Sequence, residues 1–219
     1  MKLPASLLLS ALAAALLLLL VEIEAVGVAF HKLGLSTTSA GLWIAVSIFG
    51  SFINIPLCSW RRGEPPRDYL PPPLQRLLRM PRHPAVGRTV LAVNVGGGVV
   101  PVASSAYLFR HAGLDMGTSM VATGLVAVVC RFASRPLTGV GIGVPIFVPP
   151  LTAAGLALLI DPEKSAALAY VCGTLGVLIG ADLTRLHEIR QMGAPVASIG
   201  GAGTFDGIFL TGLVAVLLA

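Results

Sequence analysis

Long apolar runs dominate the chain, and polar residues are concentrated in the shorter stretches between them. Seven apolar segments can be drawn, at 4–27, 38–58, 86–109, 115–133, 139–160, 165–184 and 197–219. Most of them reach the roughly 20 residues that a transmembrane helix needs. Uninterrupted runs such as "ALAAALLLLL" exclude a closed β-barrel, which needs alternating positions. The pattern predicts an all-α fold, a polytopic transmembrane helical bundle of about seven spans, several of them interrupted by Gly and Pro.

Composition supports this prediction. The chain of 219 residues is 55% hydrophobic and 11% charged, with a mean hydropathy of +0.88, whereas soluble domains carry about 25% charged residues. Nothing remains for a soluble domain, so we expect a single integral membrane domain over 1–219. Lys2 followed by a Leu/Ala run resembles a signal peptide, but the apolar run is longer than usual. We therefore expect an uncleaved first span.

A basic, proline-rich loop at 59–88 sets the expected orientation. It contains seven arginines, and basic loops stay cytoplasmic. If the chain alternates across the bilayer, twelve basic residues fall on the side of this loop, and only Lys32, Arg110 and Lys164 fall on the other. The N-terminus is then cytoplasmic, and the lipid bilayer is the expected partner. No basic face with interleaved aromatic residues points to a nucleic acid.

Three of the predicted spans contain residues that break helices. They include "NVGGGVVP" (94–101), "GVGIGVPIFVPP" (139–150) and "SIGGAGTFDG" (198–207), and "SFINIP" (51–56) is a smaller case. Glycine weakens a helix and proline removes a hydrogen-bond donor. Such segments favour either close helix packing, which we expect for Gly173 and Gly176, or a binding site of the kind that transporters build from interrupted helices.

Two acidic residues, Asp182 and Asp206, fall inside apolar segments. An aspartate at the bilayer centre costs roughly 2.5–3.5 kcal/mol, so such residues are functional candidates. Asp182 precedes Arg185 by three residues and could pair with it, whereas Asp206 has no basic residue at helical spacing. If the two carboxylates meet, they share one proton and can act as acid and base. Separate structural roles and ion or proton coupling remain open alternatives.

These observations define the candidate site. Asp182 and Asp206 are the candidate catalytic residues, and the candidate substrate-binding residues are Asn54, Asn94, Gly203 and Gly207. His31, His83, His111 and His187 are far apart in the sequence, so no metal site is predicted. The glycine runs lack a strand–turn–helix context, so no dinucleotide or other cofactor is predicted.

Parts of the chain resemble a known family. "GSFINIP" (50–56), "GTLGVLIGADL" (173–183) and "GAPVASIGGAGTFDGIFLTGLVAVLL" (193–218) resemble a family of uncharacterised prokaryotic membrane proteins, the domain of unknown function 1614. The resemblance implies a multi-span protein of the prokaryotic inner membrane, and it implies no particular activity.

A second resemblance is to the presenilin-like and prepilin-peptidase-like intramembrane aspartyl proteases. These proteins carry one aspartate in one helix and a second in a Gly-x-Gly-Asp motif, which Asp182 and "GTFDGIF" (203–209) would match. Phe205 stands where the second glycine of the motif belongs. The resemblance implies cleavage of membrane-embedded peptides by Asp182 and Asp206. The alternatives are a transporter or channel that moves a small solute, with the aspartates coupling a cation or proton, and a non-catalytic membrane scaffold.

Overall fold

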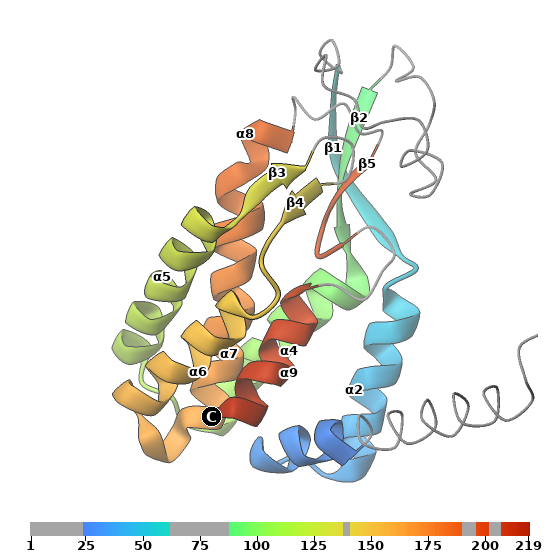
Figure 1. Ribbon diagram of the computed structural model, residues 1–219. Helices are drawn as coiled ribbons and strands as arrows, with labels where there is room; N and C mark the ends of the chain where they lie inside the picture. Colours follow the sequence, from blue (N-terminus) through green and yellow to red (C-terminus); the bar gives the residue numbers. More distant parts are fainter. Residues whose placement is uncertain (1–23, 62–87, 138–140, 190–195, 202–206) are drawn as a thin grey trace, which may run out of the picture.

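Helices form most of the molecule, and two small sheets lie toward one end of it (Figure 1). The computed structural model describes residues 24–61, 88–137, 141–189, 196–201 and 207–219. The first part comprises a helix over Glu24–Lys32, α2 (Thr37–Gly50), β1 (Asn54–Arg61), β2 (Arg88–Asn94), the π-helix η1 (Val95–Val99) and α4 (Val100–His111). Then come α5 (Met116–Ala133), β3 (Arg135–Leu137), β4 (Gly141–Gly143), α6 (Val148–Ile160) and the 3₁₀ turn η2 (Pro162–Lys164). The last part comprises α7 (Ser165–Val177), the π-helix η3 (Leu178–Asp182), η4 (Leu183–Arg185), α8 (Leu186–Ile189), β5 (Val196–Ile199) and α9 (Gly207–Leu218).

Two of the described helices are long and apolar enough to cross a membrane. They are Met116–Ala133, which is α5, and the 27-residue stretch Pro162–Glu188, which contains α7. A third candidate is the pair Glu24–Lys32 and Thr37–Gly50, which is bent by 112°. The helices Val148–Ile160 and Ile208–Leu218 are apolar but shorter. The predicted bundle of seven spans is therefore not confirmed, although α5 matches its predicted segment to within one residue.

The other apolar segments divide into a helix and an extended part. Segment 38–58 becomes α2 and β1, segment 86–109 becomes β2, η1 and α4, and segment 197–219 ends as α9 after β5. In each case glycine, proline or asparagine lies at or near the break, and these residues interrupt the helical hydrogen-bond ladder. The all-α prediction is thus correct for the body of the molecule and missed the strands.

The larger sheet has the order β1-β2-β5, with β1 antiparallel to β2 and β2 parallel to β5. Arg61 pairs with Arg88 in this register, so both ends of the predicted loop at 59–88 are strand residues. Residues 62–87 of that loop lie outside the described part of the chain. The sheet brings three predicted spans together at one point, which is where the candidate site is built.

Helix α7 lies at the centre of the packing and contacts α4, α5, α6 and α9. Gly176 and Gly180 face α5, where a Cβ on Gly180 would collide with the carbonyl oxygen of Ala127 and one on Gly176 would lie 2.5 Å from Val126. Small residues four positions apart let two helices approach closely. The close packing expected at Gly176 is confirmed, and Gly173 likewise packs against Ala153 of α6.

Basic side chains lie at both ends of the bundle and satisfy helix termini there. At one end Lys32 donates to the carbonyl of Leu217 at 3.2 Å, and Lys164 donates to that of Gly113 at 2.6 Å. At the other end Arg131 and Arg185 lie where α5 and η4 terminate. The chain runs back and forth between these two ends (Figure 1), and both lysines belong to the minority set assigned to the side away from the basic loop.

Candidate functional site

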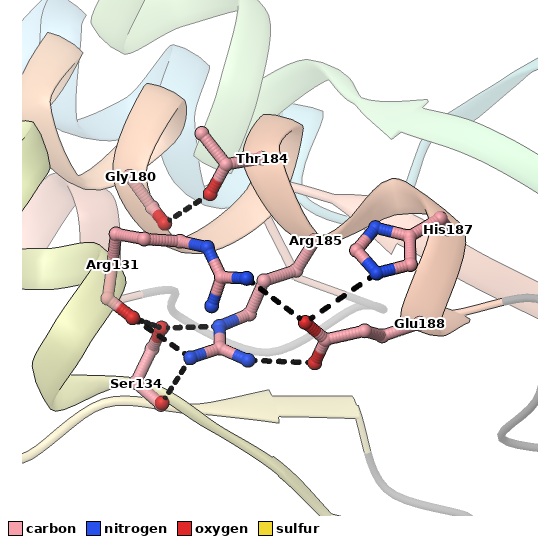
Figure 2. Close-up of polar contacts among 7 residues, drawn as sticks. All are labelled: Arg131, Ser134, Gly180, Thr184, Arg185, His187 and Glu188. Carbon is pink, nitrogen blue, oxygen red and sulfur yellow. Dashed lines mark hydrogen bonds and ion pairs between the residues drawn. The ribbon is translucent and has the colours of Figure 1, made fainter.

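Asp182 is the last residue of the π-helix η3, which continues α7. Gly180, within this π-helix, packs directly against the backbone of α5. One turn later the hydroxyl of Thr184 donates to the carbonyl of Gly180 at 2.7 Å (Figure 2). π-helical turns inside longer helices are frequent at functional sites. Asp182 is half-buried at this position.

The carboxylate of Asp182 reaches the end of the neighbouring sheet. The backbone N–H of Gly200 donates to Asp182 Oδ2 at 3.2 Å. Gly200 has φ +81°, a left-handed conformation that favours glycine, and its Cα faces the backbone of Gly98 so closely that a Cβ would collide with Gly98 N. This contact fixes the turn after β5 directly against Asp182.

Asp182 lines a cavity of about 450 Å³, which we call the Asp182 cavity. Its walls come from segment 142–150, from the end of α7 with η3, and from the first half of α9. The wall residues are mostly apolar: Ile142, Val144, Pro145, Ile146, Phe147, Pro149, Pro150, Val177, Ala181, Ile208, Leu210, Thr211 and Val214. Among the described residues that line the cavity, Asp182 has the only ionisable side chain. The cavity therefore combines one carboxylate with mostly apolar walls.

Of the two acidic residues three positions from Arg185, Glu188 forms the ion pair that the structure shows. Arg185 is buried and donates to Glu188 Oε2 at 2.6 Å, to Ser134 Oγ at 2.6 Å, and to the carbonyls of Arg131 and Ser134 at 2.7 and 2.6 Å (Figure 2). Arg131 also contacts Glu188, at 3.2 Å. Four acceptors on α5, its C-cap and α8 therefore hold this guanidinium.

Asn54 and Asn94 meet at the junction of β1, β2 and η1. Asn94 is fully buried; its amide nitrogen donates to the carbonyl of Ser51 at 2.6 Å and to Asn54 Oδ1 at 3.2 Å. Its Oδ1 accepts from the N–H of Gly97 at 2.8 Å and so caps the π-helix. Ser198 of β5 donates to Asn54 Oδ1 at 2.6 Å. These contacts give both asparagines a role in joining α2, η1 and the sheet.

The structure brings part of the predicted site together. Residues 198–200 contact both the asparagine pair and Asp182. Ser198 donates a hydrogen bond to Asn54, and the N–H of Gly200 donates one to Asp182. Gly207 begins α9 and is followed by Ile208, which lines the Asp182 cavity. Asp206 and Gly203 lie outside the described residues.

Several residues of the site were missed from sequence. Thr211 carries no signal of its own, and Gly200 was noted only as part of a glycine-rich segment, because a backbone donor and a helix hydroxyl become relevant only through the fold. The proline-rich wall at 145–150 was recognised as a break in a helix, but its position over Asp182 depends on packing between α6, α7 and α9.

The fold and site define a mostly helical protein that contains apolar helices of membrane-spanning length and one carboxylate in an apolar cavity. The family model described as "Protein of unknown function (DUF1614)" matches residues 48–218. The chain belongs to this family, as its sequence resemblance implies. No curated protein and no solved structure matches the chain.

Proposed function

We propose that this chain is an integral membrane protein that binds an apolar, membrane-embedded peptide in the Asp182 cavity and hydrolyses it with Asp182 and Asp206. The observation that carries the proposal is the position of Asp182 in an otherwise apolar cavity of about 450 Å³. An acidic side chain in such surroundings is costly, and in membrane proteins it marks functional sites by default.

Membrane placement is supported by the apolar surface of α5. Its exposed side chains are large and apolar, and they include Met120, Val121, Leu125, Val128 and Phe132. The exposed fraction of Phe132 is 83%. In water such a surface would be unfavourable, whereas lipid chains solvate it well. The basic residues at the two ends of the bundle then lie at the two membrane surfaces.

The proposed pairing of Asp182 with Asp206 is supported by contacts that the residues before and after 202–206 make with the Asp182 cavity. Gly200 bonds Asp182 Oδ2 directly, and Ile208 lines the same cavity. Asp206 is two residues from Ile208 in the sequence, and consecutive Cα atoms are about 3.8 Å apart. The chain is thus tied to the Asp182 cavity immediately before and after the segment that contains Asp206.

The proposed chemistry uses one proton shared between two carboxylic groups. The ionised carboxylate takes a proton from water as the water oxygen bonds to the peptide carbonyl carbon. The protonated group then gives its proton to the leaving nitrogen as the C–N bond breaks. The apolar walls exclude bulk water and strengthen these interactions.

A transporter is the second candidate, and the broken segment 141–150 favours it. Here β4, Pro145 and the start of α6 form one wall of the cavity. Irregular backbone at membrane depth is tolerated where it is buried or lines a cavity, and transporters place solute sites beside interrupted helices. In this case Asp182 couples a proton or cation to a small solute and cleaves nothing.

The two candidates are separated by an assay in liposomes. The purified protein is reconstituted with a library of apolar 20-residue peptides, and products are identified by mass spectrometry, while a trapped dye reports proton flux. We expect Asp182→Asn and Asp206→Asn each to lower cleavage at least about 100-fold, and Glu163→Gln, which removes an exposed carboxylate at the opposite end, to leave it unchanged. Proton flux without cleavage supports the transporter, and the absence of both activities in the unmodified protein excludes both candidates.

A further inference from the structure

A second cavity lies between α4, α5 and α7, and its volume is about 650 Å³. We call it the Arg110 groove. It shares no lining residue with the Asp182 cavity. Apolar and small residues form its length, among them Val102 and Ala106 of α4 and Gly124 and Ala127 of α5. Nothing lies within 4 Å of the position that a Cβ on Gly124 would take, so the groove is open there.

A positively charged side chain, that of Arg110, lies at one end of the groove. Arg110 lines it from the last turn of α4 and is exposed. Within the part of the chain that the structure describes, Arg110 makes no hydrogen bond or ion pair. Among the described residues at this end, Lys32 donates to the carbonyl of Leu217 in α9 and Lys164 donates to that of Gly113, just after α4. Arg110 is thus positioned to bind an anion from outside the described chain.

A buried hydroxyl in the same groove also lacks a partner. Ser119 is 5% exposed, and its Oγ has no hydrogen-bond partner among the described residues. It follows Met116, the first residue of α5, by three positions, or about 4.5 Å along the helix axis. A buried hydroxyl without a partner is unfavourable, and an acceptor held in the groove would satisfy it.

Aromatic residues mark this end as a membrane interface. Trp43 of α2 packs edge-on against Tyr107 of α4 with ring centroids 5.8 Å apart, and Tyr107 stacks on His111 at 5.2 Å. Trp and Tyr are enriched at the level of lipid headgroups. Because Tyr107 precedes Arg110 by less than one turn, the guanidinium lies near that level.

We propose that the Arg110 groove binds one anionic glycerophospholipid. An acyl chain lies along the small residues of α4 and α5, Arg110 binds the phosphate, and Ser119 donates to an ester carbonyl. The order of these groups from the end of the bundle inward is the order in the lipid: phosphate, ester, chain. An apolar groove with an arginine at its mouth complements the charge and the apolar chain of an anionic amphiphile. This inference rests on the membrane placement in the proposed function but not on any peptide cleavage or transport.

Native mass spectrometry with two lipids of identical acyl chains tests the proposal. Phosphatidylglycerol is the anionic probe and phosphatidylcholine the zwitterionic one. We expect one phosphatidylglycerol to be retained preferentially and Arg110→Gln to weaken its binding about tenfold, the loss of one charge-assisted contact. Arg135→Gln, which removes an exposed arginine at the other end, should have no effect. Gly124→Leu, which fills the groove in open space, should weaken binding by a similar factor.

Three results would overturn the proposal. Equal retention of both lipids by the unmodified protein would remove the role of charge. Unchanged phosphatidylglycerol binding in Arg110→Gln or in Gly124→Leu would place the lipid elsewhere. If Gly124→Leu instead turned an oligomer into a monomer without changing lipid binding, the groove would be an interface between copies of the chain. Circular dichroism of each variant verifies that it is folded.

Discussion

The amide of Asn94 holds three parts of the molecule together, and its removal should have a large effect on stability. Asn94→Ala removes the hydrogen bonds to the carbonyl of Ser51, to Asn54 Oδ1 and from Gly97 N–H, all at a fully buried position. Each bond contributes about 1 kcal/mol net, and buried groups left without partners add to the loss. The expected decrease in unfolding free energy is about 3–5 kcal/mol. For a chain of this size, that lowers the melting temperature by roughly 10 °C.

Buried thiols provide the assay. Cys130 and Cys172 are buried and Cys58 is exposed, so in a Cys58→Ser background a thiol-reactive dye reports unfolding in detergent as the temperature rises. Thr152→Ala is the control, because the Thr152 hydroxyl bonds only the carbonyl of Val148 in its own helix and its loss should change the midpoint little. A midpoint for Asn94→Ala within about 1 °C of the unmodified protein would refute the structural role of this amide and favour the ligand-binding role that the sequence suggests.

Three further predictions are also measured as melting midpoints. Gly180→Ala should lower the unfolding free energy by about 1–3 kcal/mol because its Cβ meets the backbone of α5. Its control, Gly155→Ala, has nothing within 4 Å of its Cβ and should raise the unfolding free energy by about 0.5–1 kcal/mol. Equal effects of the two substitutions would contradict the packing of α7 against α5. Arg185→Ala should cost about 3 kcal/mol, since it leaves a buried acceptor set unpaired, and an unchanged midpoint would contradict this. Hydrogen bonds from the backbone and then the side chain of Thr118 lower the pKa of Asp115 below its usual 3.8, so its stabilisation is complete above pH 3.8 and is lost as pH falls through the lowered pKa. With circular dichroism as the readout, the difference in midpoint between the unmodified protein and Asp115→Ala should therefore shrink only below about pH 4. A difference independent of pH would refute the role of the charge.

Sequence alone predicted the long helices well and the sheets not at all. Helix α5 and the stretch 165–182 have long, predominantly apolar sequence without proline, and local propensity suffices to place them. The strands are short apolar runs that could equally be helical. Their pairing depends on distant partners: Ser198 and Asn54, for example, are 144 positions apart.

The candidate site was predicted only in part, because some of its contacts join residues that are distant in the sequence. Asp182 was recognised because acidic residues are rare in apolar sequence. Asn54 and Asn94 were recognised because they lie beside helix breaks, and the structure shows that they are hydrogen-bonded to each other. The bond from Gly200 to Asp182 and the choice of Glu188 as the partner of Arg185 depend on how the helices pack. A spacing of three residues fits both acidic neighbours of Arg185, so spacing could not decide between Asp182 and Glu188.

Disulfide formation between positions 182 and 206 tests the central claim, that two carboxylates share one site, most directly. Asp182→Cys and Asp206→Cys are combined in a Cys58→Ser background, where the remaining native thiols are buried. A disulfide requires Cα atoms about 4.4–6.8 Å apart. The control combines Asp182→Cys with Asp161→Cys, which is separated from it by the full length of α7. The account predicts rapid intramolecular cross-linking of the first pair and none of the second. Failure of the first pair to cross-link in folded protein would contradict it.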